Sequence, residues 1–110
     1  LAPGALATAI RELGSLGLPV HVSEMDVSLT RAKGFMPNRA DLLARQGRLY
    51  AEAAQAFCDL PAAQRFAFTL WGLRDMDSWL VRENAADRPL LFDDAGRPKP
   101  AAAAWAGALR

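Results

Sequence analysis

The sequence has a single cysteine, no long apolar run and no excess of charge of either sign, and each absence excludes something. Cys58 has no partner for a disulfide within the chain. No apolar stretch approaches the roughly 20 residues that a transmembrane helix needs. The 13 basic and 12 acidic residues leave a formal net charge of +1. This balance gives no reason to expect a nucleic acid or an anionic membrane as partner.

Motifs for metals and phosphates are also missing. The histidine, cysteine and acidic residues do not fall at metal-ligand spacing, and no glycine-rich phosphate loop is present. We therefore expect no metal and no cofactor. The sequence begins at Leu1, and its first residues already suit a helix. We expect a piece of one longer domain, so the absence of a signal peptide is uninformative.

Three stretches are predicted to be helical. Apolar residues at helical spacing predict one helix over residues 3–16 and a second from the capping residue Asn38 to Cys58. Pro100 suits the first turn of a third helix. Residues 73–98 are expected to form one long loop, because turn-forming residues recur there.

Two stretches, Leu18 to Met25 and Arg65 to Gly72, are predicted to be strands, with side chains that alternate between two faces. A helix of this length between two strands implies a parallel βαβ crossover. The fold class is therefore α/β. Parallel sheets are normally covered on both faces, so two such strands would not make a stable sheet alone.

Alternation also assigns side chains to faces. Glu24 is expected on the face of Val22. His21 is then expected on the other face, as a buried or helix-facing residue that makes a hydrogen bond. In the second strand, large residues such as Phe66 and Phe68 are expected to pack against a helix layer.

Glu24 closes the first strand, where a carboxylate is costly in a plain core because burial demands a partner or a raised pKa. It is not costly if the strand end opens onto a solvent-filled active site. From the residues alone, a solvated rim position is the commoner explanation. Taken without further context, Trp71 and Trp79 suit core positions. Lys99, between two prolines, is expected at the surface.

Four segments, in this order and spacing, resemble one known family. They are VSEMDV at 22–27, FTLWGLRDMDSW at 68–79, PLLFD at 89–93 and PKPA at 98–101. Together they resemble the C-terminal part of family 10 glycoside hydrolases, the endo-β-1,4-xylanases. Gln46 and Tyr50 fit the same family. Ser23 departs from the usual Thr, and the second cysteine that many relatives carry shortly after Cys58 is absent.

The resemblance implies a (β/α)₈ TIM barrel, of which this chain would supply helix 6, strand 7, helix 7, strand 8 and helix 8. All 110 residues would then be one C-terminal fragment of a single catalytic domain. The resemblance makes Glu24 the nucleophile and places Trp71 and Trp79 against the sugar. Asp26 and Asp75 are expected to support these residues or to cap loops rather than to react.

A retaining glycosidase needs two carboxyl groups about 5–5.5 Å apart, on opposite sides of the scissile bond. Asp26 lies two residues from Glu24 and would approach the sugar from the same side, so we reject it as the partner. The resemblance implies that the acid/base comes from strand 4, which this chain does not contain. The chain alone is therefore expected to be inactive.

The function expected of the whole enzyme is retaining endo-β-1,4-xylanase activity on xylan. The resemblance also implies a monomer that is secreted or periplasmic, without a nucleic-acid or membrane partner. One alternative is another retaining barrel enzyme that acts on cellulose or mannan. Another is a degenerate homologue that only binds sugar or does nothing.

Overall fold

The computed structural model describes residues 2–31 and 38–109. In chain order the elements are α1 (Ala5–Gly14), β1 (Val20–Met25), α2 (Arg39–Cys58), the 3₁₀ turn η1 (Ala62–Gln64), β2 (Arg65–Leu70), the 3₁₀ turn η2 (Asp75–Asp77), α3 (Trp79–Glu83) and α4 (Pro100–Ala108). None of the described helices is long and apolar enough to cross a membrane.

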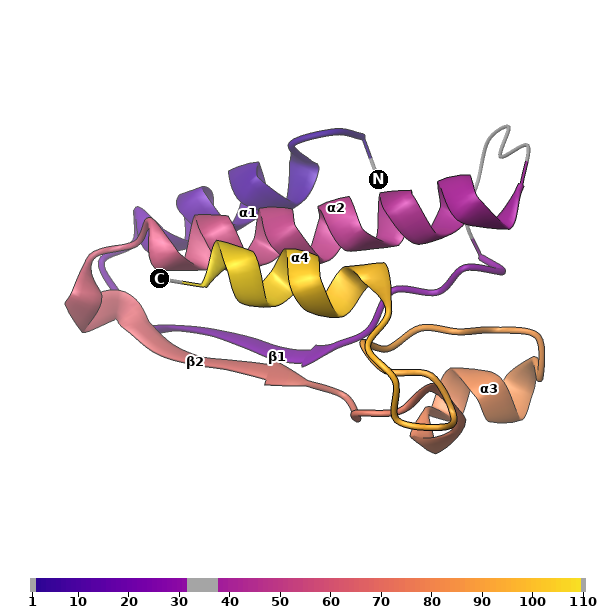
Figure 1. Ribbon diagram of the computed structural model, residues 1–110. Coiled ribbons are helices and arrows are strands. Elements are labelled where there is room, and N and C mark those ends of the chain that lie inside the picture. The colour runs from indigo at the N-terminus through magenta and orange to yellow at the C-terminus, as the bar shows by residue number, and fades with distance from the viewer. Residues whose placement is uncertain (1, 32–37, 110) are drawn as a thin grey trace.

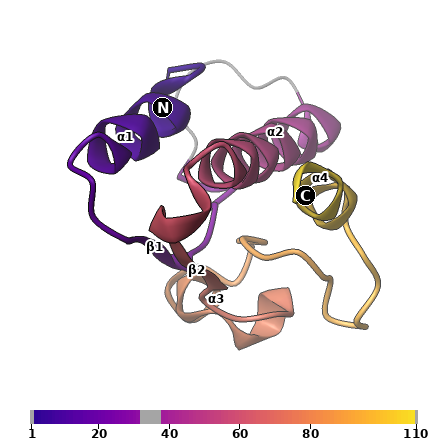
Figure 2. The same ribbon diagram turned by 90° about the vertical axis from the view of Figure 1, so that its left-hand side faces the viewer.

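The two strands pair in parallel, which confirms the predicted βαβ crossover through α2. The three longer helices, α1, α2 and α4, lie along one face of the strand pair, whereas α3 lies beyond the carboxyl ends of the strands (Figures 1 and 2). The arrangement is therefore two-layered over the length of the strands. The described residues that directly follow each strand continue toward the end where α3 lies (Figure 1).

The core fills the space between the helix layer and the sheet. One cluster consists of Ile10, Val20, Ala53, Ala56, Phe57 and Leu60, and a second of Tyr50, Leu91, Ala101 and Ala102. Met25 packs against both clusters. The Phe68 ring meets the rings of Phe57 and Trp105 edge-on, each at 5.8 Å between centroids. The expected packing of Phe68 against the helix layer is thus confirmed.

The helix signals in the sequence are confirmed at the places where they were strongest. Asn38 caps α2, and its Oδ1 accepts a hydrogen bond from the Asp41 N–H at 3.0 Å. Pro100 occupies the first turn of α4, where its missing N–H leaves no bond unmade.

The prediction that residues 73–98 form a plain loop is wrong. This segment contains η2 and α3, and Ser78 caps α3 by accepting a hydrogen bond from the Leu80 N–H at 3.1 Å. A helix of only five residues is too short to produce a readable apolar period. The capping serine was its one sequence signal.

His21 and Phe66 contradict the prediction in another way. The hydrogen bond of His21 exists, between Nε2 and Thr69 Oγ1 at 2.9 Å, but the residue is exposed. Phe66 is 71% exposed and meets the His21 ring edge-on at 5.5 Å. His21 is exposed because it lies on the face opposite Val20 and Val22, which the helix layer does not cover (Figure 2). For Phe66 the reason is a register shift: Val20 pairs with Arg65, but His21 pairs with Ala67, so Phe66 is an extra residue.

We predict that the isolated chain will not unfold in one cooperative monomeric transition. Among the described residues β1 pairs only with β2, so each strand keeps one unpaired edge. The face opposite the helices carries an exposed phenylalanine as well. Urea unfolding followed by circular dichroism and tryptophan fluorescence, with sedimentation to report the mass, tests this. Coincident sharp transitions of a monomer would contradict it.

Candidate active site

Glu24 lies in a β-bulge at the carboxyl end of β1. Val22 pairs with Phe68 and Met25 pairs with Leu70, so two residues of β1 stand opposite one residue of β2. Val22 and Met25 both pack against the core, and Glu24 is exposed. The prediction that Glu24 shares the face of Val22 is therefore wrong, because the inserted residue breaks the alternation.

The backbone of Glu24 is in the left-handed region, with φ at 58°. Among the described residues it is the only one besides glycine with a positive φ. This conformation costs an L-residue about 1–2 kcal/mol. Such strain persists only where the surrounding structure enforces it, and it gathers at functional sites. The bulge thus turns a carboxylate out of the core at the strand end, where a site can form.

Trp71 follows β2 directly and is tied to the same end of the sheet. Its N–H donates to the Met25 carbonyl at 3.0 Å, one residue beyond Glu24. The side chain is 46% exposed. Gly72 follows with φ at 126°, and a Cβ at that position would lie 2.8 Å from Leu90 Cδ1. The glycine therefore permits the sharp exit that leaves the indole at the open end of the strands.

Trp79, the first residue of α3, is held from two sides. Its Nε1–H donates to Asp26 Oδ2 at 2.9 Å, and the Arg31 guanidinium lies over its ring, with Cζ 5.2 Å from the centroid. The side chain remains 40% exposed. Asp26 therefore contacts a residue of the expected sugar-binding wall. No motif or spacing in the sequence indicated Arg31 at this position.

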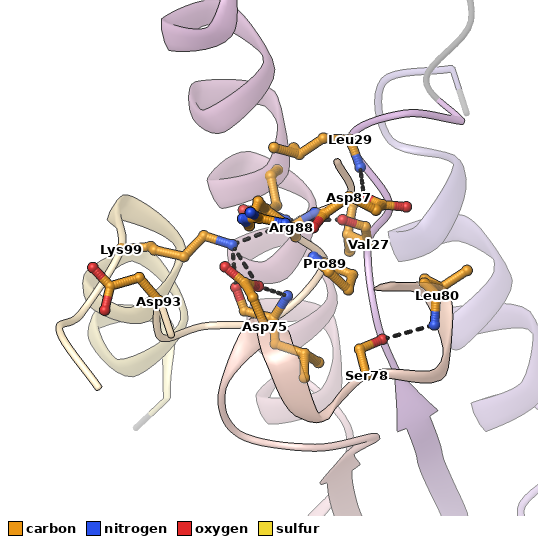
Figure 3. Close-up of polar contacts among 12 residues, drawn as sticks. Val27, Leu29, Asp75, Ser78, Leu80, Asp87, Arg88, Pro89, Asp93 and Lys99 are labelled. Carbon is orange, nitrogen blue, oxygen red and sulfur yellow. Dashed lines mark hydrogen bonds and ion pairs between the residues drawn. The ribbon is translucent and has the colours of Figure 1, made fainter. Parts of the chain in front are cut away.

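Asp75 and Lys99 form a buried ion pair (Figure 3). The Lys99 Nζ donates to Asp75 Oδ1 at 3.0 Å and to the carbonyls of Arg88 and Leu90 at 2.8 and 2.7 Å. These three acceptors match the three donors of an ammonium group. Asp75 Oδ1 also accepts from the Leu90 N–H at 2.8 Å. The prediction that Lys99 lies at the surface is wrong, since its side chain is only 9% exposed.

Burial perturbs both members of this pair. It raises the pKa of the Asp75 carboxyl above its ordinary value, although the Leu90 N–H and the Lys99 ammonium act in the opposite direction. It lowers the pKa of the Lys99 ammonium, against the attraction of Asp75. Asp75 Oδ2 is buried and has no hydrogen-bond partner among the described residues. Asp75 thus anchors a loop and does not face an open site.

A second buried carboxylate, Asp87, joins the loop that follows β1 to the segment that precedes α4. It accepts a hydrogen bond from the Leu29 N–H at 2.8 Å (Figure 3). It also accepts hydrogen bonds from the hydroxyls of Ser28 and Thr30. Burial alone would raise the pKa of Asp87, but these bonds and the Arg88 N–H outweigh it and hold the pKa below its ordinary value. No motif or spacing in the sequence indicated this role for Asp87.

Gln46 and Tyr50, which α2 presents to the same segment, complete the support. The Gln46 Nε2 donates to the Val27 and Arg88 carbonyls at 2.8 and 2.6 Å. The Tyr50 hydroxyl donates to the Pro89 carbonyl at 2.7 Å, and that carbonyl also accepts from the Val27 N–H at 3.1 Å. Burial raises the pKa of Tyr50, which keeps its hydroxyl a donor. Two helix residues therefore fix the backbone just beyond Asp26.

A cleft of about 580 Å³ between α1, α2 and β1 is a different feature. Its lining includes the polar residues Ser23, Asp26 and Arg31, but most of the lining residues are apolar, among them Leu6, Ile10, Val22, Leu49 and Ala53. Such a lining suits packed polypeptide better than a sugar. Among the described residues no group of three or more histidine, cysteine or acidic side chains could hold a metal ion.

The carboxyl end of the sheet thus brings together the exposed carboxylate of Glu24 and two half-exposed indoles, with Asp26 behind one of them. Asp75 belongs to the supporting loop. A single carboxylate beside flat aromatic surfaces can act as a nucleophile or as an electrostatic stabiliser for a sugar.

Similarity to known proteins extends over almost the whole chain. The family model of glycosyl hydrolase family 10 matches residues 2–108. An endo-1,4-β-xylanase A of Cellvibrio japonicus is 37% identical over 97 residues, which make up 76% of this chain and 16% of the relative. An exoglucanase of Acetivibrio thermocellus is 35% identical over 98 residues, or 87% of this chain and 8% of the relative.

Solved structures agree. A thermostable mutant of xylanase Xyn10A from Cellvibrio japonicus superposes with a TM-score of 0.75 and 30% identity, covering 93% of this chain and 34% of that chain. Xylanase 10B from Thermotoga petrophila, in complex with xylobiose, gives a TM-score of 0.75 and 26% identity, over 98% of this chain and 32% of that one. The chain spans about a third of these structures and less of the curated relatives. It belongs to glycosyl hydrolase family 10.

Proposed function

We propose that this chain is the C-terminal part of the catalytic domain of a retaining endo-β-1,4-xylanase. In this proposal β1 and β2 are strands 7 and 8 of a (β/α)₈ barrel, and α1, α2 and α4 are helices 6, 7 and 8. Glu24 is the nucleophile, and Trp71 and Trp79 line the sugar subsites beside it. The substrate is xylan, outside the cytoplasm, and no cofactor takes part.

The observation that carries the proposal is the bulge at Glu24. A strained, left-handed glutamate at a strand end is retained against its cost, and it exposes the carboxylate at the end of the sheet that also carries both indoles. In (β/α)₈ barrels, residues at the carboxyl ends of strands form the active site. The xylobiose bound to a related family 10 structure supports the substrate class.

The chemistry is double displacement. The Glu24 carboxylate attacks the anomeric carbon and forms a glycosyl ester, while a second carboxylic acid protonates the departing glycosidic oxygen. That second group then takes a proton from water, which attacks the anomeric carbon and releases Glu24 as a carboxylate. Asp26 is unsuited to this second role because its Oδ2 is bound by the Trp79 indole. The second acid lies outside this chain.

A second candidate substrate is a β-1,4-glucan. The related Acetivibrio thermocellus protein is named an exoglucanase, and its identity to this chain is close to that of the Cellvibrio xylanase. Comparing the cleavage of xylan with that of carboxymethylcellulose by the complete catalytic domain separates the two substrates.

The proposal predicts a covalent label on Glu24. The complete catalytic domain is treated with a 2-deoxy-2-fluoro xylobioside that bears a good leaving group, and its peptides are analysed by mass spectrometry. The fluorine slows hydrolysis of the glycosyl ester, so the label is expected on the peptide that contains Glu24. A domain that cleaves xylan without acquiring the label at this residue would disprove the assignment.

Replacing the carboxylate by an amide gives an independent test. Glu24→Gln in the complete domain should lower kcat on an aryl xylobioside at least about 1000-fold, because covalent catalysis is lost. Glu12→Gln is the matched control, since Glu12 is an exposed acid on α1 away from the strand ends. Its kcat should equal that of the wild type. A small loss in the Glu24 variant would be the contradicting result.

The 110-residue chain by itself should not hydrolyse xylan, because the acid that protonates the leaving oxygen is not within it. Reducing-sugar release by the purified chain is compared with that of the complete domain at equal molar concentration. Activity that copurifies with the chain and disappears in its Glu24→Gln variant would refute this expectation.

A further inference from the structure

The side chain of Trp79 contacts two polar side chains, Asp26 and Arg31, that are distant from it in the sequence. Asp26, after β1, accepts the indole N–H at 2.9 Å. Arg31, five residues further on, places its guanidinium over the ring at 5.2 Å, and the same guanidinium pairs with Glu83 of α3. We propose that Arg31 is a positioning residue that holds the Trp79 ring in the orientation in which it receives a sugar; the proposal rests on the function proposed above.

The contact has the geometry of a cation–π interaction. A guanidinium within about 6 Å of an indole centroid is attracted to the ring face, and tryptophan is the strongest such partner. The planar guanidinium of arginine can also stack on the ring, which an ammonium cannot do. Since Arg31 covers one face, a sugar can stack only on the other face of Trp79. The ring is thereby oriented before the substrate arrives.

Glu83 provides a second contact for the Arg31 guanidinium. It lies four residues after Trp79 in the same short helix, so the guanidinium of Arg31 contacts both side chains of one helical turn. The loop after β1 is therefore attached to α3 through the aromatic ring itself. A ring held in this way loses less rotational freedom when the substrate binds, and the affinity rises accordingly.

The exposure of the ion pair between Arg31 and Glu83 distinguishes a role in positioning Trp79 from a role in stabilising the fold. The side chains of Arg31 and Glu83 are 56% and 53% exposed. Ion pairs as exposed as this contribute little to folding. Removing the guanidinium should therefore leave the fold intact and act on sugar binding.

The test uses the complete catalytic domain with a neutral aryl xylobioside as substrate. Arg31→Leu should raise KM about five-fold with little change in kcat or Tm, as loss of one exposed cation–π contact and its orienting effect predicts. The KM of Arg31→Lys should lie between those of the wild type and Arg31→Leu, because lysine keeps the charge but not the planar group. Arg97→Leu is the matched control: Arg97 is also exposed and pairs with Asp93 in the turn before α4. Its KM should not change.

Ionic strength supplies a second readout that a merely structural role would not move. Because the substrate is neutral, salt acts on the protein alone and screens the exposed charges. The KM of the wild type should rise with salt, and that of Arg31→Leu should not. A salt-independent wild type would overturn the proposal, as would a KM for Arg31→Leu equal to that of Arg97→Leu or a fall in Tm that accounts for its loss of activity.

Failure of the underlying function has a different signature. If Trp79→Ala leaves KM unchanged in a domain that cleaves the substrate, Trp79 does not bind the sugar. If the wild-type domain neither cleaves nor binds the xylobioside, the xylanase assignment itself is wrong. Either result overturns the role of Arg31 as well. A wild type sensitive to Trp79→Ala but not to Arg31→Leu removes only the positioning role.

Discussion

The ammonium group of Lys99, buried against Asp75, is the interaction on which the functional end of the molecule depends. It joins η2, the backbone of residues 88–90 and the start of α4 at one point. Removing one partner of such a pair leaves the other charged and unpaired in the interior, which costs several kcal/mol. Because η2 leads directly into α3, this ion pair also determines where Trp79 lies. Two buried charges thus hold in place the long connection between β2 and α4, which contains no strand.

The segment at 88–92 takes the place of a strand there. Its carbonyls accept hydrogen bonds from Gln46, Tyr50 and Lys99, and its N–H groups donate to Asp75 and to the Leu73 carbonyl. Backbone polar groups buried outside regular structure need partners of this kind. Here side chains from α2, η2 and the start of α4 provide most of them.

The elements of the fold follow from the sequence wherever a local rule applies. The Asn38 cap, Pro100 in a first turn and the helix between two strands all led to the observed elements. Alternation failed at Glu24 and Phe66, because each is an inserted residue and no local pattern marks an insertion. Lys99 and Asp87 could not be predicted either. Their partners lie 24 and 58 residues away, and only the tertiary arrangement reveals the charge or the donors that face them.

The residues of the candidate site also fall into those that the sequence predicted and those that it did not. Glu24, Trp71 and Trp79 were predicted from motifs, and the structure brings them to one end of the sheet. Arg31 was not predicted, because it lies in none of the motifs and its contact is with the ring of Trp79, 48 residues away in the sequence. Residues that contact other side chains, and not a ligand, are hard to recognise from the motifs of a single sequence.

The left-handed backbone of Glu24 has a consequence for enzyme engineering. Among replacements that delete the carboxylate, glycine alone adopts this conformation without penalty, whereas alanine keeps the strain and a β-branched residue increases it. A glycine at this position would therefore preserve the bulge while it removes the only charged group that the bulge exposes, so the effect of the charge can be separated from the effect of the backbone.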